Sequence, residues 1–397
     1  MKRLLSALAV LLGLTGMGRV PAAVPLPQLA IDSAQTSLSG LSSGGFMAVQ
    51  MHVAYSATFK KGAGIVAGGP FHCAEGSIVN ATGRCMAHSS SIPVASLVTT
   101  TNNWAGQGLI DATSNLAGGK VYLFSGSIDS TVKPAVMDDL RSYYRSYVPD
   151  ANVVYKKDLA AEHAMVTDDY GSGCSVKGSP YINDCNFDLA GAMLQQIYGT
   201  LNGRNSGTLS GTFTEYDQGA FVSGHGMAAT GWVYVPQACA AGSTTRCRLH
   251  LVLHGCKQNT AEIGQQYVRN TGYNRWADTN NIVLLYPQTS QAATNSCWDW
   301  WGYDSANYAK KSGPQMAAIK AMIDRVSSGG GTPPPPPDAA TCTTASNYAH
   351  TTAGRAHVSG WYALANGSNQ NMGLWNVFIV STLKNTGPNY YVIGTCP

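Results

Sequence analysis

Short apolar runs alternate with amphipathic segments along most of the chain. Four runs have the β-branched and aromatic content of buried strands, at 121–124, 152–155, 249–253 and 282–286. Four segments have apolar residues at helical spacing, at 46–56, 135–148, 187–198 and 314–326. Pro134 and Pro314 stand where helices tend to begin. Strands that alternate with helices predict an α/β fold with helices on both faces of a sheet.

Two stretches, 206–236 and 328–338, break this alternation. The first is rich in Thr, Ser and Gly with strand-like alternation, which predicts antiparallel strands. The second joins a Gly run to five consecutive prolines, which is typical of a linker whose polyproline part extends roughly 15 Å. We therefore expect a large domain over 24–327, a linker over 328–338 and a small, β-rich module over 339–397.

The first 23 residues have the pattern of a secretory signal. Lys2 and Arg3 precede an apolar run over 4–14, and small residues around 20–23 offer a cleavage site. The run is too short for a membrane span, and the sequence has no other apolar run long enough for one. The alternative is an ordinary N-terminal core helix. We expect an extracellular protein without a membrane partner.

Composition narrows the classes of function. Only 12% of the residues are charged and the net charge is +4, which gives no electrostatic footprint for nucleic acid. A hydrophobic content of 44% allows a large buried core and excludes a disordered or collagen-like chain. The few charges, with many Ser, Thr and Asn, predict a neutral surface that an uncharged polymer would not repel.

The ten cysteines agree with export, because disulfides persist in oxidising compartments. Nearest-neighbour pairing is the simplest interpretation, although sequence alone leaves the connectivity open. It joins Cys73–Cys85, Cys174–Cys185, Cys239–Cys247, Cys256–Cys297 and Cys342–Cys396. The last bridge would tie the ends of the small module, which is too short to depend on its core alone. No Cys or His cluster has zinc spacing, so we expect no metal and no other cofactor.

Gly40, Ser42 and Gly44 form a G-x-S-x-G motif between a β-prone stretch at 36–39 and a predicted helix. At a strand-to-helix elbow the serine occupies a strained, exposed turn, and the glycines let strand and helix approach closely. This context predicts that Ser42 is a nucleophile. The alternative is a Gly/Ser turn in which Ser42 or Ser43 caps the helix.

A serine nucleophile needs a base, and the base needs an orienting carboxylate. Asp129 follows the strand at 121–124, and His163 follows the strand at 152–155. Loops at the carboxyl ends of strands form the site in such sheets, and the chain order Ser, Asp, His is that of α/β-hydrolases. We therefore predict a Ser42–His163–Asp129 triad. Taken singly, Asp129 also fits a turn or a helix cap, and His163 a surface position.

Only one recognisable strand precedes Ser42, whereas the standard hydrolase order has several. The strand at 249–253 ends in a His-Gly pair and Cys256, which resembles the loop that donates the second oxyanion N–H in esterases. The helix at 314–326 is one that would normally lead into the elbow strand. We therefore predict a circularly permuted α/β-hydrolase, with the N–H groups of Ser43 and Cys256 as its oxyanion hole. Alternatively, the His-Gly pair and Cys256 are only a strand end and a disulfide anchor.

Aromatic residues are concentrated at 297–303 and in the small module. Trp300 or Trp301 near the mouth of a site could pack on an apolar acyl chain, while a buried place in a loop core suits either equally well. The module over 339–397 is rich in Tyr and Trp. Some of these must form its core, and two or three left outside would make an adhesive face.

Together these motifs resemble the extracellular poly(3-hydroxybutyrate) depolymerases, in the type whose catalytic domain is a permuted α/β-hydrolase. The motifs that carry the resemblance lie at 40–45, 126–129, 162–163, 254–256 and 297–301. Segments at 346–350, 354–357 and 389–392 are similar to the polyester-binding domain of that family. A Gly/Pro stretch stands where family members often have a longer Thr-rich or fibronectin-like linker.

The resemblance implies a secreted serine esterase that releases 3-hydroxybutyrate monomer and oligomers from a solid polyester. Ser42 would attack the ester carbonyl, His163 would transfer the proton and Asp129 would hold the imidazolium. The N–H groups of Ser43 and Cys256 would stabilise the oxyanion, and the C-terminal module would bind the polymer surface. We expect a monomer without a nucleic-acid partner. Two rivals are a feruloyl or acetyl-xylan esterase with a carbohydrate-binding module, and a non-catalytic surface-binding protein.

Overall fold

A computed structural model describes residues 23–330, 342–387 and 390–394. The chain divides into two compact units, Met1–Gly331 and Thr332–Pro397. We call them the larger and the smaller unit. The proposed signal segment falls almost wholly on residues outside the described part. Among the described residues, no helix is both long and apolar enough to cross a membrane.

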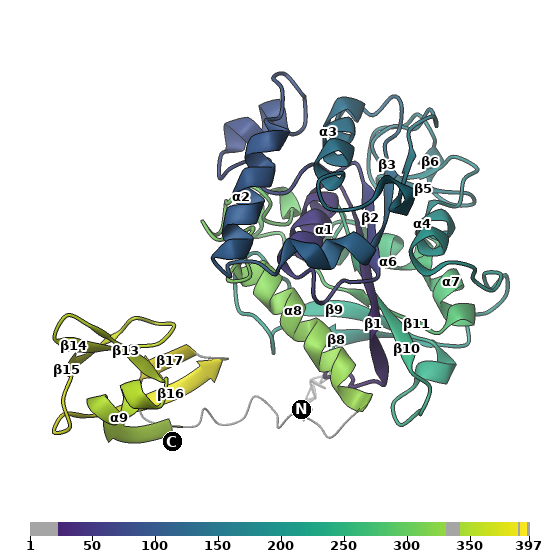
Figure 1. Ribbon diagram of the computed structural model, residues 1–397. Helices are drawn as coiled ribbons and strands as arrows, with labels where there is room; N and C mark the ends of the chain where they lie inside the picture. The colour runs from purple at the N-terminus through teal and green to yellow at the C-terminus, as the bar shows by residue number, and fades with distance from the viewer. Residues whose placement is uncertain (1–22, 331–341, 388–389, 395–397) are drawn as a thin grey trace, which may run out of the picture. The chain divides into compact units, whose positions relative to one another are not determined.

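An eight-stranded sheet forms the centre of the larger unit, with helices on both of its faces (Figure 1). Six neighbouring strands are parallel, and the last two add antiparallel pairings at one edge. In spatial order the strands are β4 (Val153–Lys156), β3 (Lys120–Phe124), β2 (Gly62–Val66), β1 (Ile31–Leu41), β10 (Cys247–Leu253), β11 (Ile282–Tyr286), β9 (Thr230–Val235) and β8 (Thr212–Asp217).

The helices follow the strands in chain order. The longer ones are α1 (Ser43–Ala54), α2 (Val94–Gly106), α3 (Pro134–Tyr144), α4 (Leu189–Tyr198), α7 (Tyr273–Asn280) and α8 (Pro314–Ser327). Proline occupies the first turn of α3 and of α8, where its missing N–H is not needed. Asp188 caps α4 by accepting a hydrogen bond from the N–H of Gly191 at 2.7 Å. A small parallel sheet, β5 (Met165–Thr167), β7 (Ile182–Asp184) and β6 (Ser172–Gly173), follows β4.

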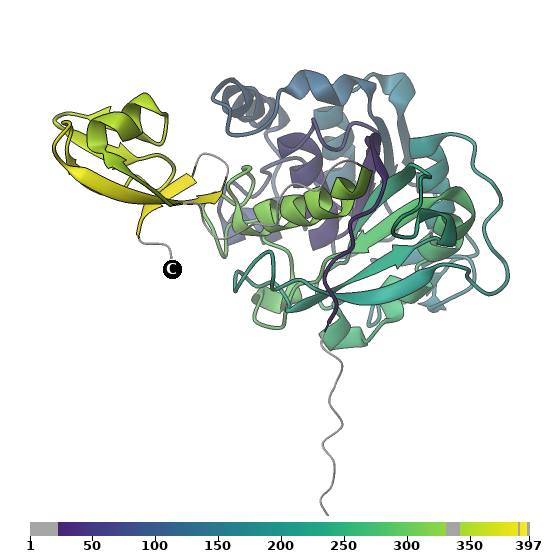
Figure 2. The same cartoon turned by 90° about the horizontal axis from the view of Figure 1, so that it is seen from below.

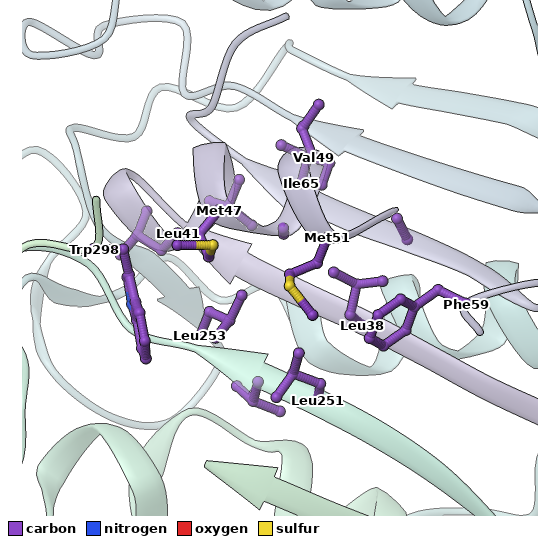
Figure 3. Close-up of a cluster of buried hydrophobic side chains, with 14 of the residues drawn as sticks. Leu38, Leu41, Met47, Val49, Met51, Phe59, Ile65, Leu251, Leu253 and Trp298 are labelled. Carbon is purple, nitrogen blue, oxygen red and sulfur yellow. The ribbon is translucent and has the colours of Figure 1, made fainter. Parts of the chain in front are cut away.

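The predicted strands and helices are confirmed, as are the antiparallel strands within 206–236. The strand expected at 36–39 is longer and runs from Ile31 to Leu41. Every residue of α1 is buried, because this helix packs on the sheet and is covered by other elements. Figure 3 shows Met47 and Met51 of α1 above Leu38, Leu251 and Leu253 of the central strands.

The ends of the larger unit show how the chain has been permuted. The end of α8 is bonded directly to the segment before β1, through Leu29 N–H to Val326 O at 2.8 Å and Gly329 N–H to Leu29 O at 3.1 Å. Strand β1 comes first in the sequence yet lies in the middle of the sheet, beside β10 from the far end of the domain. The α/β sheet and this connection confirm the predicted circularly permuted α/β-hydrolase fold.

Disulfide bonds link the loops of the larger unit. The four bridges expected there are confirmed: Cys73–Cys85, Cys174–Cys185, Cys239–Cys247 and Cys256–Cys297. The fifth expected bridge involves Cys396, which lies outside the described residues. Three of the four close loops of 8 to 12 residues, and Cys256–Cys297 spans 41.

The smaller unit is β-rich, as expected. One sheet contains β12 (Cys342–Ser346), β16 (Val380–Gly387) and β17 (Tyr390–Ile393), and the other contains β13 (Ala356–Ser359), β14 (Tyr362–Ala365) and β15 (Asn371–Leu374). All described pairings in both sheets are antiparallel, and one short helix, α9 (Asn347–Thr352), joins the first strands (Figure 2). The core is small: Ala356, Ala363, Ala365, Met372 and Leu383.

Candidate active site

Ser42 occupies the turn between β1 and α1 with φ 57° and ψ −123°, a conformation that non-glycine residues rarely adopt. The Ser42 N–H donates to Val66 O and the Ser42 carbonyl accepts from Phe46 N, both at 2.9 Å. Although Ser42 is the N-cap residue by position, its side chain makes no capping hydrogen bond. The strained turn therefore has the geometry of a nucleophile elbow.

Two glycines allow the elbow to pack closely. A Cβ atom on Gly40 would lie 2.1 Å from the carbonyl oxygen of Gly44. A Cβ atom on Gly44 would lie 2.4 Å from the carbonyl oxygens of Leu253 and His254 at the end of β10. Only glycine fits at either position, so these residues bring the start of α1 against β1 and β10.

Asp129 and His163 form a hydrogen-bonded pair in the loops that follow β3 and β4. His163 Nδ1 donates to Asp129 Oδ2 at 2.8 Å. The other carboxylate oxygen, Oδ1, accepts the N–H groups of Thr131 at 2.8 Å and Val132 at 2.9 Å. Both partners are buried. Because a carboxylate only accepts, the proton of the neutral ring resides on Nδ1, and Nε2 is left able to take a proton.

Glu162 links the two loops, a role that the sequence motif did not indicate. Its Oε2 accepts the N–H of His163 at 2.7 Å and the N–H of Ser130 at 3.2 Å. Partial burial raises the pKa of Glu162, but the hydrogen bonds from Ser130 and His163, together with the charge of Lys177, outweigh burial and hold that pKa below its usual value. One ionised carboxylate thus fastens the residue after Asp129 to His163.

The loop after β10 lies against the elbow. A Cβ atom on Gly255 would be 3.3 Å from the Cβ atom of Ser42. The next residue, Cys256, lines the same cavity as Ser42 and is fixed by its bridge to Cys297. Ser43 is the first residue of α1 and is buried; the N–H groups of a first helical turn have no partner within the helix.

Gln258 fastens this loop to a second loop far away in the sequence. Its Oε1 accepts the N–H of Gly255 at 2.7 Å, while its Nε2 donates to Pro180 O at 2.9 Å and Tyr181 O at 3.0 Å. The side chain is buried. The sequence contains no periodic signal for this contact, because the partners are separated by 77 and 78 positions.

Ser42, His163 and Cys256 line one cavity of about 420 Å³. Its walls also include Trp300 and Trp301, so the structure brings together most of the predicted site residues. Apolar residues that sequence reasoning missed make up much of the wall: Leu41, Phe46, Ile78, Ala81, Met86 and Val132. Polar side chains also line it, among them Lys177, Tyr181 and Lys257. Such a mainly apolar recess with a few polar groups is typical of a ligand site.

The tryptophan loop is rigidly held. Trp300 stacks on Phe46 with ring centroids 3.9 Å apart, and both Trp300 and Trp301 are at most 8% exposed. Asp299 accepts four backbone N–H groups, from Gly302, Tyr303, Asp304 and Ser305. Burial raises the pKa of Asp299, although these hydrogen bonds oppose the shift. The loop therefore forms a fixed wall of the cavity.

In the described part of the chain, no group of three or more His, Cys, Asp or Glu side chains could hold a metal ion. The cavity brings together a serine and an imidazole that is hydrogen bonded to a buried carboxylate, beside the backbone N–H groups of the elbow and of the loop after β10. This combination suits acyl transfer through a covalent serine intermediate.

Comparison with known proteins places this chain in a family. A family model described as "Esterase PHB depolymerase" matches residues 231–330. A poly(3-hydroxybutyrate) depolymerase of Delftia acidovorans is 59% identical, with 99% of this chain and 98% of that protein aligned. A polyhydroxybutyrate depolymerase of Talaromyces funiculosus is 42% identical over 78% of this chain and 94% of its own length.

A solved structure supports the same assignment. A PHB depolymerase variant complexed with an R3HB trimer superimposes with a TM-score of 0.73 and 40% sequence identity. The match covers 77% of this chain and 99% of that chain. The chain thus belongs to the poly(3-hydroxybutyrate) depolymerase family.

Proposed function

We propose that this chain is a secreted serine esterase that hydrolyses poly(3-hydroxybutyrate) to 3-hydroxybutyrate monomer and oligomers. The observation that carries the proposal is the strained elbow of Ser42, which lines the same cavity as His163, whose ring is hydrogen bonded to Asp129. The polyester substrate is suggested by the names of the Delftia acidovorans and Talaromyces funiculosus relatives.

In the proposed reaction, Ser42 Oγ attacks the ester carbonyl while His163 Nε2 takes its proton. Asp129 holds the ring and stabilises the imidazolium. His163 then protonates the departing alkoxide oxygen, the ester C–O bond breaks, and the acyl group remains on Ser42. Water loses a proton to His163 and attacks the acyl carbonyl. His163 then returns this proton to Ser42 Oγ as the bond between the acyl carbon and Oγ breaks, which restores the serine and releases an acid that ionises to a carboxylate.

The N–H groups of Ser43 and Cys256 are the proposed oxyanion hole. Gly255 lies against Ser42, and Ser43 starts a helix whose first N–H groups lack intrahelical partners. Two N–H groups aimed at the developing O⁻ would be worth several kcal/mol of transition-state stabilisation, at roughly 3 kcal/mol per donor.

Trp300 and Trp301 are the proposed contacts of the acyl chain. They contribute apolar wall to the cavity and are held by stacking on Phe46 and by the Asp299 turn. A mainly apolar, rigid recess suits an uncharged polyester with short methyl branches.

The smaller unit is proposed to bind the solid polymer. It exposes an aromatic patch that we define as Tyr348, Trp361, Trp375 and Phe378, of which Trp361 is 83% and Phe378 87% exposed. Three of the members are neighbours: the backbone N–H of Trp375 donates to Trp361 O at 2.9 Å, and the rings of Tyr348 and Trp375 lie 5.7 Å apart. Exposed apolar surface of this kind is typical of an interaction site.

The test of hydrolysis is the loss of turbidity of a poly(3-hydroxybutyrate) granule suspension, with the Ser42→Ala variant alongside the wild type. Clearing by the wild type alone is expected. Clearing by both would exclude Ser42 as the nucleophile. If the granules do not clear, while the wild type but not Ser42→Ala cleaves a soluble p-nitrophenyl ester, the triad stands and the polymer is excluded as a substrate.

Deletion of 333–397 tests the division of labour between the units. Hydrolysis of the soluble ester should persist, while attack on granules should fall, because tethering raises the local concentration of ester bonds. The solved PHB depolymerase aligns over 99% of its own length with only 77% of this chain. A protein of that extent therefore folds without the remainder, which supports a catalytic unit able to fold alone. Equal losses on both substrates would refute the division.

The comparisons do not favour a feruloyl or acetyl-xylan esterase. That rival predicts binding of the full chain to cellulose or xylan and not to polyester granules, which a pull-down with each solid would reveal. Export is proposed from residues 1–23 and agrees with the four disulfides, which an oxidising compartment preserves.

A further inference from the structure

One buried imidazole lies next to the proposed oxyanion donor and is not used by the triad. His254 Nδ1 is 2.7 Å from the carbonyl oxygen of Gly255. A carbonyl only accepts, so Nδ1 carries the hydrogen. On the other side of the ring, the backbone N–H of Thr289 donates to Nε2 at 3.2 Å. These two partners, one an acceptor and one a donor, fix the tautomer of His254.

The surroundings of His254 keep it neutral and in place. The residue is 1% exposed, and its ring lies 5.2 Å from the ring of Trp298 and 6.4 Å from that of Tyr267. Burial lowers the pKa of His254 to about 4, partly opposed by the hydrogen bond with Gly255. Its backbone carbonyl accepts the indole N–H of Trp298 at 2.9 Å. The ring therefore acts near neutral pH as a fixed N–H donor.

The bond acts on the peptide that contains the Cys256 N–H. In a trans peptide the C=O and N–H are coplanar and point in opposite directions, so holding the Gly255 oxygen sets the direction of the Cys256 N–H. Among the residues that the structure describes, none accepts a hydrogen bond from this N–H. The backbone N–H of Gln258 also reaches the Gly255 oxygen, but at 3.3 Å. His254 thus makes the shorter contact with this carbonyl.

We propose that His254 is a positioning residue, which orients and polarises the Gly255–Cys256 peptide so that the Cys256 N–H becomes a strong oxyanion donor. The inference rests on the proposed function. Hydrogen bonds in a chain polarise one another, so a donor at the carbonyl strengthens the N–H at the other end of the peptide. The imidazole itself does not touch the substrate.

The test compares His254→Leu with His254→Asn. Leucine fills similar space without a donor, whereas the asparagine amide nitrogen can occupy the place of Nδ1 and still donate. For a soluble ester, His254→Leu should lower kcat roughly 10- to 100-fold with KM changed less than about twofold, below the full loss of an oxyanion donor. His254→Asn should recover most of the loss. Affinity for a boronic acid that forms a tetrahedral adduct should fall in parallel with kcat.

Several outcomes would overturn the inference. A folded His254→Leu variant with unchanged kcat and boronic acid affinity would make the contact merely structural, and so would equal losses in both variants. If His254→Leu does not fold, ¹⁵N spectra of the wild-type histidines decide: a Nδ1–H tautomer whose resonance moves on boronic acid binding is expected, and a Nε2–H tautomer contradicts it. Full activity of Ser42→Ala in the same assay would instead remove the proposed function.

Discussion

The two units use tryptophan and phenylalanine in opposite ways. In the larger unit, Trp298, Trp300 and Trp301 are at most 8% exposed, whereas Trp361 and Phe378 of the smaller unit are 83% and 87% exposed. In the first set, Trp300 and Trp301 line the cavity, and Trp298 donates its indole N–H to His254 O. The second is presented to the surroundings. Residue content therefore does not distinguish a buried aromatic wall from an exposed aromatic patch, but placement does.

The difference follows from what fills each core. The larger unit has a wide sheet covered on both faces, with space for buried aromatic rings. The core of the smaller unit is mostly alanine, at 356, 363 and 365, and leaves little room for rings inside. A substitution in a close-packed cavity wall should therefore cost much activity or stability, whereas each substitution in an exposed patch should have a smaller effect.

Asp129→Asn should lower kcat on a soluble ester by roughly 10⁴-fold, because an amide nitrogen facing His163 Nδ1 favours the wrong tautomer. Binding to granules should be unchanged. Initial rates and a granule pull-down measure the two properties. Asp158→Asn, an exposed carboxylate paired with Lys156, is the control and should leave both alone. Retention of more than a tenth of the rate by Asp129→Asn would contradict the triad.

Removing the Cys256–Cys297 bridge by a double Cys→Ser change should lower the free energy of unfolding by about 4 kcal/mol, since it closes 41 residues. It should also lower kcat, because Cys256 lines the cavity. The same change at Cys239–Cys247, which closes only 8 residues, should cost less stability and leave kcat unchanged. Urea unfolding and ester hydrolysis give the values. Equal kcat in both variants would mean that the bridge does not hold the site.

Trp361→Ala combined with Phe378→Ala should weaken binding of the full chain to granules roughly 10- to 100-fold, because each ring contributes apolar area on contact. The kcat on a soluble ester should not change. A depletion isotherm measures the affinity. Val154→Ala removes an exposed apolar side chain from the larger unit and is the matched control. Equal binding by both variants would show that the polymer contacts another surface.

Acidification should affect the larger unit more than the smaller one. Burial lowers the pKa of His52 and His254 to about 4 and of His250 to about 3. Below pH 6.5 these histidines are protonated in the unfolded chain but stay neutral in the folded one. The free energy of unfolding therefore falls as the pH falls from 6.5 toward 4. In the smaller unit, burial lowers the pKa of His350.

Hydrogen exchange of the full chain at pH 7 and pH 5, corrected for intrinsic rates, measures this difference by segment. Protection in the central strands of the larger unit should fall by a larger factor than protection in β12–β17. A uniform loss over both units would show that the buried histidines do not set the acid sensitivity.

The same contrast explains what the sequence could predict. Local signals in the sequence mark the strands and helices with clear periodicity. They also mark the proposed triad, whose members lie in loops that follow strands. Strand β2 was missed because Gly62 and Gly64 interrupt its apolar run. The role of Glu162 and the residue Gln258, which both fasten the site, were missed because their contacts depend on tertiary structure. Such partners leave no spacing rule in the chain.

The bond between Leu29 and Val326 has a consequence for engineering. It brings the N-terminal and C-terminal ends of the larger unit together at the start of β1. The eleven residues of that strand separate these two ends from Ser42 by roughly 35 Å. Attachment to a resin, or fusion of a tag or of a binding module from another protein, at either end would leave the cavity mouth unobstructed. Because of the permuted connection, the fusion partner of this hydrolase can be exchanged without changing the residues of its active site.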